Sequence, residues 1–415
     1  MRLPRLSADL TPLRESRDLR LLLSGAFLTG LGTQAALVAV PYQVYTQTHS
    51  PFLTGLLGAV ELGPLVAASL LGGAYADRVD RRRLLLAVQG ALVATASVLA
   101  AASFAGHPPL PVLYVLAGLL AGFGAIENVT RSSIVPNLAS PANLRSALAL
   151  NYGLSTLTMV VGPAVGGVLI GAAGVGAAYA VDAGSCLAMV LAALAIAPQR
   201  PTTVGTPGAI RHEIAEGLRF VRSNDALLGS FAIDLVAMTF GMPRALFPVL
   251  SLSVYHAGAA GTGVLFAAVA AGATVAALTT GWLKTARRLG LIVLWAVLAW
   301  GAAIALAGLA STLWLAAVLL AIAGGADSVS AVCRTTINQS VTPDEMRGRM
   351  SAVYSLVVTS GPRLGDIESG AVASLTTPRV SVVSGGLACV VGAGLLVFAF
   401  PALLAYDADR ALAAA

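Results

Sequence analysis

Twelve runs of mostly apolar residues, each near the ~20 residues that a helix needs to cross a bilayer, constrain this chain more than any other feature. Backbone inside a membrane must satisfy its own hydrogen bonds, and continuous runs of this length do so as α-helices. Only 11% of the 415 residues are charged, against roughly 25% in a soluble domain. We therefore predict an all-α integral membrane protein with twelve transmembrane helices, at residues 20–46, 52–75, 84–105, 110–132, 146–171, 176–197, 226–254, 262–283, 290–309, 313–334, 350–375 and 380–404.

Arginine residues cluster on alternate loops of this topology. They precede the first span and occupy every second loop, whereas the opposite loops contain Arg379 and almost no other basic residue. By the positive-inside rule, both termini are expected to be cytoplasmic, in a multi-pass protein of a bacterial cytoplasmic membrane. Because the arginines alternate with spans instead of forming one surface, we expect the lipid bilayer as a partner and no nucleic acid.

One stretch of the chain occurs twice. Residues 162–171 and 361–370 share the frame G-P-x-(V/L)-G-x-x-x-x-G, and further matches lie about 200 residues apart. Such a duplication predicts two pseudo-symmetric six-helix bundles with a substrate path between them and transport by alternating access. The expected parts are residues 1–197, residues 225–415, and a cytoplasmic linker at 198–224 that contains a short amphipathic helix.

Ionisable residues inside the spans are the candidates for function. Charge is costly in lipid, and a buried acid can load and release a proton. We expect the cavity or coupling residues to be Glu61, Asp327, Arg363 and Asp366. Arg363 and Asp366 stand at i and i+3 and are expected to pair, whereas Glu127 and Arg131 at i and i+4 are expected to form a structural ion pair.

Other ionisable groups in the spans receive a weaker assignment from the sequence. Asp182 is expected to be structural. Asp234 and Arg244, both in the seventh span, receive no role. Glu368 lies about 200° around the helix from Asp366, so the two acids are not expected to face the cavity equally.

The loop after the second span resembles a known signature. Residues 73–82 read G-A-Y-A-D-R-V-D-R-R and are similar to the G-x-x-x-D-R-x-G-R-R loop of the major facilitator superfamily, with Asp80 in place of the family glycine. The resemblance implies the major facilitator fold and a cytoplasmic gate formed by Gly73, Asp77, Arg78, Arg81 and Arg82.

The fifth span carries a second resemblance. It is similar to the G-P-x-x-G-G element of proton-coupled exporters, which implies a packing motif at Gly162, Pro163, Gly166 and Gly167. The chain as a whole is similar to the drug-antiporter branch that contains enterobactin-type siderophore exporters. The fourth span lacks the R-x-x-x-G signature of many drug antiporters, so a mechanism that uses its arginine does not carry over.

The resemblance implies a monomeric secondary transporter that exports an amphipathic small molecule, a siderophore or a drug, in exchange for protons. Two alternatives stay open: a nutrient importer of the same fold, and a lipid translocator or facilitator without proton coupling. The sequence contains no nucleotide-binding loop of the G-x-x-x-x-G-K-(S/T) type and no metal-binding or catalytic constellation. We therefore expect neither an enzyme nor a cofactor.

Overall fold

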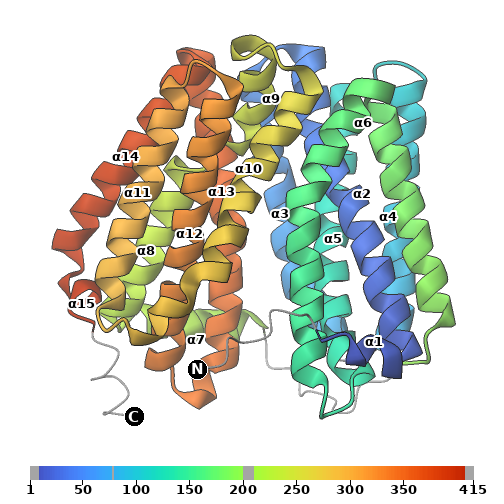
Figure 1. Cartoon of the computed structure of the whole chain (residues 1–415), viewed down its shortest axis with the longest axis horizontal. Helices are drawn as coiled ribbons and strands as arrows, with labels where there is room; N and C mark the ends of the chain where they lie inside the picture. The colour runs from blue at the N-terminus through green and yellow to red at the C-terminus, as the bar shows by residue number, and fades with distance from the viewer. Residues whose placement is uncertain (1–8, 77–78, 200–209, 407–415) are drawn as a thin grey trace. The chain divides into compact units, whose positions relative to one another are not determined.

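A computed structural model describes residues 9–76, 79–199 and 210–406, and all regular secondary structure in these ranges is helical (Figure 1). The chain forms two compact units. Unit 1 comprises residues 1–39 and 67–206, and unit 2 comprises residues 40–66 and 207–415. The helices α2 (Arg17–Thr48) and α3 (Pro51–Ala76) therefore contribute to both units. The domain boundaries expected from the sequence stay a prediction.

Within the described ranges, ten helices are long and apolar enough to cross a membrane. One of them, α6 (Leu144–Ala195), accounts for two predicted spans because Gly174, with φ 81° and ψ 171°, interrupts its helical geometry. A positive φ of this size favours glycine, which has no Cβ. The helix α13 (Arg347–Leu375) matches the eleventh predicted span but carries Arg363, Asp366 and Glu368, which make it more polar than the others. The predicted all-helical membrane fold is confirmed.

Unit 1 is built around the packing of α4 (Arg81–Phe104) on α5 (Leu110–Leu138) and α6. Two glycines of the predicted packing motif bring α6 close to α2. A Cβ atom on Gly162 would lie 2.5 Å from the Cβ of Gln34, and one on Gly166 would lie 2.7 Å from the Cα of Ala35. Small residues at such positions let helix backbones approach each other in lipid. The short helix α1 (Thr11–Glu15) also contacts α6.

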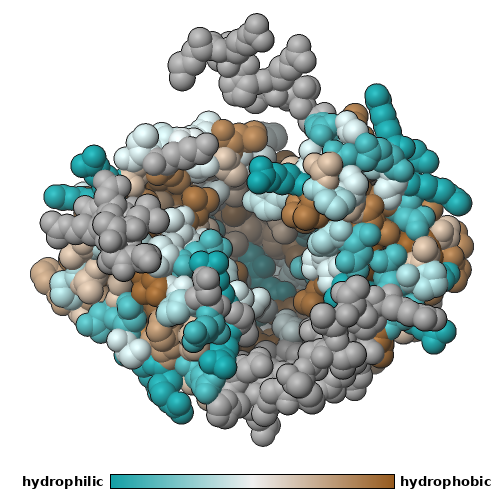
Figure 2. Space-filling model, turned by 90° about the horizontal axis from the view of Figure 1, so that it is seen from below, coloured by the Kyte–Doolittle hydropathy of each residue, from teal (hydrophilic) through white to brown (hydrophobic). Residues whose placement is uncertain are grey.

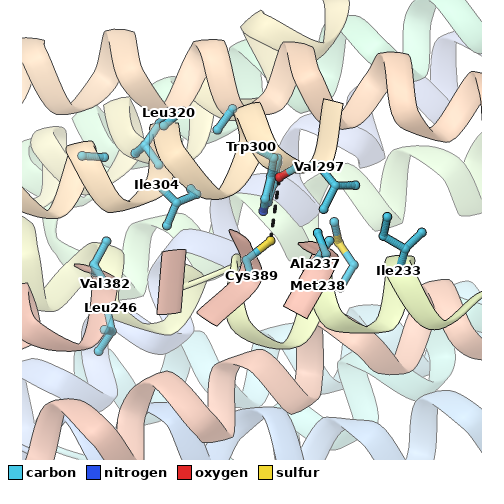
Figure 3. Close-up of a cluster of buried hydrophobic side chains, with 14 of the residues drawn as sticks. Ile233, Ala237, Met238, Leu246, Val297, Trp300, Ile304, Leu320, Val382 and Cys389 are labelled. Atoms are coloured by element: carbon cyan, nitrogen blue, oxygen red, sulfur yellow. Dashed lines mark hydrogen bonds between the residues drawn. The ribbon is translucent and has the colours of Figure 1, made fainter. Parts of the chain in front are cut away.

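Unit 2 contains the remaining helices. In this unit α12 packs on α10 and α11, α14 packs on α11 and α8, and α13 packs on α8. The core surrounds the fully buried Trp300, and the thiol of Cys389 donates to the carbonyl of Val297 at 3.9 Å (Figure 3). The elements are α7 (Ile210–Arg222), α8 (Asp225–Phe240), η1 (Arg244–Leu246), α9 (Phe247–Val249), η2 (Leu250–Val254), α10 (Gly258–Thr279), η3 (Thr280–Thr285), α11 (Leu289–Leu309), α12 (Leu313–Val341), η4 (Asp344–Met346), α13, α14 (Pro378–Ala399) and α15 (Pro401–Leu404).

The duplicated sequence frame makes the same kind of contact in both units. In unit 2, a Cβ atom on Gly361 would lie 2.7 Å from the Cβ of Met238, and one on Gly365 would lie 2.5 Å from the carbonyl oxygen of the same residue. The frame thus packs α13 against α8 in unit 2, just as it packs α6 against α2 in unit 1. Its conserved spacing in the two copies has a physical reason, because each glycine removes a side chain from a close helix crossing.

The segment between the two halves of the sequence contains a helix. This helix, α7, packs on α13, where Glu216 and Arg349 form an ion pair of 3.0 Å. A Cβ atom on Gly217 would lie 3.0 Å from the carbonyl oxygen of Arg349, so the two helices are in close contact. Figure 2 looks from below at the end that carries α7 in Figure 1, and many hydrophilic side chains gather there.

We expect Gly166→Ala to lower the melting temperature of the purified protein, because its new methyl group would press on the backbone of Ala35. Overpacking of this kind costs about 1–3 kcal/mol. The control is Gly171→Ala on the same helix, where nothing lies within 4 Å of the added Cβ. Thermal unfolding in detergent measures both variants, and equal melting temperatures would contradict the packing role of Gly166.

Candidate functional site

The seventh predicted span is broken near its middle. The helix α8 ends at Phe240, and regular structure resumes only at Arg244. The intervening residues include Gly241, which favours helix ends, and Pro243, which has no backbone N–H to donate to a helix. A broken span leaves backbone groups without helical partners, and such groups must find other partners in lipid.

Asp366 supplies those partners from α13. One carboxylate oxygen accepts from the backbone N–H of Ala245 at 3.0 Å, and the other accepts from the guanidinium of Arg244 at 2.9 Å. The neighbouring Gly365 allows this contact, because its lack of a side chain lets α13 approach the carbonyls of Met238 and Thr239. Through these two contacts Asp366, which is only 7% exposed, caps the helical segment that begins at Arg244.

Arg363 does not pair with Asp366 as the i, i+3 spacing suggested. Its partner is Glu61 of α3, at 2.9 Å. The reason is the close approach of α3, where a Cβ atom on Gly58 would lie 2.3 Å from the carbonyl oxygen of Arg363. Glu61 stands one turn beyond Gly58 and so reaches the guanidinium. Asp366 is meanwhile held by Arg244, a residue to which the sequence assigned no role.

The four side chains form one charge cluster of two carboxylates and two guanidiniums: Glu61, Arg244, Arg363 and Asp366. The ion pairs Glu61–Arg363 and Arg244–Asp366 are neighbours, because Arg363 and Asp366 lie one turn apart on α13. A buried charge that loses its partner is strongly destabilising. Neutralising one acid of this charge cluster therefore leaves one arginine without its partner.

A second group of charges joins α12 to α8. Arg334 contacts the carboxylate of Asp234 closely and that of Asp327 at 3.5 Å. The side chains of Arg334 and Asp234 are 4% exposed, whereas that of Asp327 is 34% exposed. The structure thus gives Asp327 an arginine partner and adds Asp234, which sequence reasoning left without a role. In the sequence, Asp234 stands out only as an acid in an apolar span. Its partner could not be predicted, because Arg334 lies on a different helix.

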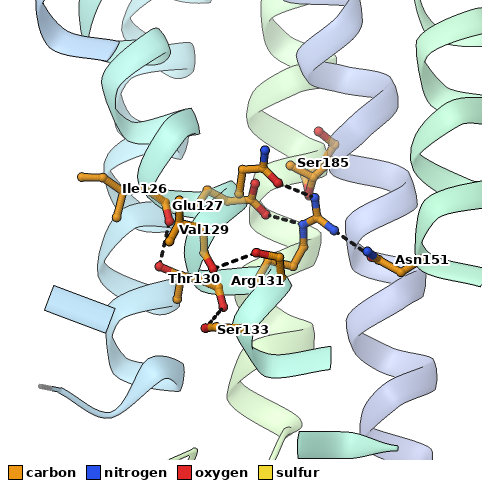
Figure 4. Close-up of polar contacts among 11 residues, drawn as sticks. Ile126, Glu127, Val129, Thr130, Arg131, Ser133, Asn151 and Ser185 are labelled. Carbon is orange, nitrogen blue, oxygen red and sulfur yellow. Dashed lines mark hydrogen bonds and ion pairs between the residues drawn. The ribbon is translucent and has the colours of Figure 1, made fainter. Parts of the chain in front are cut away.

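In unit 1, the charged side chains of Arg131 and Asp182 also have neutral polar partners. Arg131 donates to Glu127 at 3.0 Å and to the side-chain oxygen of Asn151 at 3.0 Å (Figure 4). Asp182 accepts from the hydroxyl of Thr33 at 3.4 Å and from the thiol of Cys186 at 3.8 Å. The structural role expected for the Glu127–Arg131 pair stays a prediction.

The loop between the second and third spans is described in part. Asp80, the departure from the family glycine, accepts from the backbone N–H of Arg82 at 2.9 Å and so caps the start of α4. Arg82 donates to the last carbonyls of α6, at 2.9 Å and 2.7 Å, and Arg81 donates to the carbonyl of Ser133 at 3.1 Å. These contacts all lie inside unit 1. The other residues expected at the gate are Gly73, which belongs to α3, and Asp77 and Arg78, which lie outside the described residues.

Comparison with known proteins identifies the family to which this chain belongs. A family model described as "Transmembrane secretion effector" (MFS_3), a family of the major facilitator superfamily, matches residues 7–413. The chain belongs to this family. It is therefore a multi-pass secondary transporter of a small-molecule substrate, and not an enzyme. Within the described ranges, no group of three or more His, Cys, Asp or Glu side chains is placed to hold a metal ion.

Curated relatives of the family are similar over most of their length. Proteins named "Enterobactin exporter EntS" from Shigella boydii serotype 4 and from Citrobacter koseri are each 30% identical over 363 residues, which is 87% of this chain and 86% of theirs. The same identity and coverage hold for an exporter of that name from Escherichia coli O139:H28. These relatives agree with the branch that the sequence resembles.

Solved structures confirm the fold. The nucleoside transporter NupG matches with a TM-score of 0.75 at 12% identity, over 93% of this chain and 99% of that one. A POT family transporter in complex with 5-aminolevulinic acid matches with a TM-score of 0.72 at 12% identity, over 94% and 97%. At this identity the likeness concerns the major facilitator fold alone.

We expect Glu61→Gln to lower stability by about 1–3 kcal/mol, because it leaves Arg363, whose side chain is only 15% exposed, without its partner. The double variant Glu61→Gln/Arg363→Gln removes both charges and should recover much of that loss. Thermal unfolding of the wild type, both single variants and the double variant completes the cycle. Strictly additive losses would show that the two side chains do not interact.

Proposed function

We propose that this transporter exports a siderophore from the bacterial cytoplasm across the cytoplasmic membrane, in exchange for protons. The charge cluster of Glu61, Arg244, Arg363 and Asp366 is the observation that carries the proposal. It joins the broken seventh span to α3 and α13 through two ion pairs of 2.9 Å. A proton or a charged substrate that takes the place of one partner would release the corresponding helix contact, as a coupled transporter requires.

The substrate class comes from the relatives. Their printed name assigns them the export of enterobactin, and they share 30% identity with most of this chain. We therefore take a siderophore as the first substrate to test, with a lipophilic cationic drug as the competing exporter substrate.

The orientation follows from charge. Arginine-rich segments alternate with the spans, so the positive-inside rule places both termini in the cytoplasm. The arginine contacts between α4 and the ends of α5 and α6 would then lie at the cytoplasmic surface. In this reading the protein acts as a monomer whose two halves rock around the substrate, and the loop of Asp77 and Arg78 serves as its cytoplasmic gate.

We expect enterobactin efflux from proteoliposomes to depend on an imposed pH gradient. Glu61→Gln and Asp366→Asn should each reduce this gradient-driven efflux at least tenfold, because each removes one acid of the charge cluster. Transport of the siderophore and release of protons are measured together, the latter with a trapped pH-sensitive dye.

The matched control is Asp225→Asn, which removes an exposed acid at the start of α8 and should transport normally. Efflux at the same rate without the pH gradient and in both variants would rule out antiport and favour a facilitator or lipid translocator. Uptake against the siderophore gradient would identify an importer. Transport of a cationic dye without transport of enterobactin would identify a drug exporter.

A further inference from the structure

We propose that a water-filled polar column along α12 releases the coupling proton to the cytoplasm, with Asp327 as the acid that gives it up. The proposal deepens the proton antiport inferred above and rests on it. The column consists of Asp327, Ser330, Arg334 and Asn338 of α12 and of Thr342, the residue that directly follows this helix.

The column follows one face of the helix. Its members are spaced by three or four residues, which places them above one another along an α-helix. The opposite face carries Val318, Ile322 and Val332, which are 58%, 54% and 39% exposed and suit contact with lipid. α12 is therefore amphipathic, and its polar side faces the interior of unit 2.

Several polar atoms of the column are buried without a partner. Ser330, Arg334 and Asn338 are 1%, 4% and 8% exposed. The Oγ of Ser330, the Nε of Arg334, the Oδ1 of Asn338 and one carboxylate oxygen of Asp234 find no hydrogen-bond partner among the described residues. Buried polar atoms in proteins are nearly always bonded to protein or to water. Water molecules along this column would satisfy all four atoms.

The column opens into a cavity at one end. This cavity has a volume of about 290 Å³, room for several waters at ~30 Å³ each. Asn338 and Thr342 belong to both the column and the cavity wall, which also includes Thr335, Ser351 and Tyr354. The predicted topology places this end of α12 at the cytoplasmic surface, so the cavity would connect the column to the cytoplasm.

Few charged groups of the described part of the chain face the column. Asp234 approaches it from α8, and Arg347 and Tyr354 approach it from α13. The two helices that pack most closely on α12, α10 and α11, contain no titratable residue. The only acids in direct reach of Arg334 within the described ranges are thus Asp234 and Asp327.

The proton step is a simple exchange. The carboxylic acid of Asp327 breaks its O–H bond, passes the proton to a column water, and becomes a carboxylate that Arg334 holds. The proton then moves between waters past Asn338 and leaves through the cavity. Asp234 stays paired with Arg334 throughout and positions the guanidinium.

Cysteine accessibility tests the hydration of the column. In a background in which Cys186, Cys333 and Cys389 are replaced by alanine, Ser330→Cys and Asn338→Cys are treated with methanethiosulfonate ethylammonium in membrane vesicles. Both should react at least tenfold faster than the matched control Val332→Cys on the lipid-facing side, because the reactive thiolate forms in water. Equal, slow labelling of all three positions would overturn the column.

A second variant tests proton release. Asn338→Leu should reduce enterobactin-driven proton release at least tenfold while enterobactin exchange at equal pH, which needs no net proton release, stays near the wild-type rate. Val332→Leu is the control and should change neither. Unchanged proton release, or an equal loss of release and exchange, would contradict a dedicated path.

The two tests separate this inference from the proposed function. If the wild type shows no proton-coupled transport, the antiport proposal fails, and with it the role of the column in proton release. Cysteine labelling would still decide whether the column holds water. If transport is coupled but Asn338→Leu releases protons normally, only the column is wrong.

Discussion

The structure depends on one constraint, which is that every charge and every free backbone group inside the membrane needs a partner within the protein. The break in the seventh span is where this constraint acts most strongly. Asp366 resolves it by accepting from the backbone of Ala245 and from Arg244. That contact requires α13 to lie against α8, which Gly365 permits. The pairing of Asp366 with Arg244 in turn leaves Arg363 to Glu61.

The two copies of the duplicated frame show the same packing element without charges in unit 1 and with charges in unit 2. Both copies use their glycines to bring helices together, α6 onto α2 and α13 onto α8. The first copy has Ala164 and Gly167 at the positions where the second has Arg363 and Asp366. The packing geometry is thus shared, and the charges are added to it in unit 2. There the two acids and the two arginines pair with one another, which lowers the cost of placing charge between the helices.

Much of the fold could be predicted from the sequence, because the length and hydrophobicity of each span are local properties of the chain. Run length located the helices, and the glycine at 174 marks the division between the fifth and sixth spans. The candidate acids were also visible, since an ionisable residue in an apolar run stands out. Their partners were not. The i, i+3 spacing of Arg363 and Asp366 suggested a pair, but each side chain meets a better-placed group on another helix.

The sequence by itself determined that this chain crosses a membrane as two related sets of helices and which of those helices carry charge. These features follow from hydrophobicity and periodicity along a single segment. Only the tertiary structure decided which charges meet, that Arg244 and Asp234 belong to these groups of charges, and that the polar side of α12 ends in a cavity. The physical reason is that an ion pair between helices depends on how closely and at what rotation two backbones pack. Positions far apart in the chain, such as Gly58 and Gly365, set that packing.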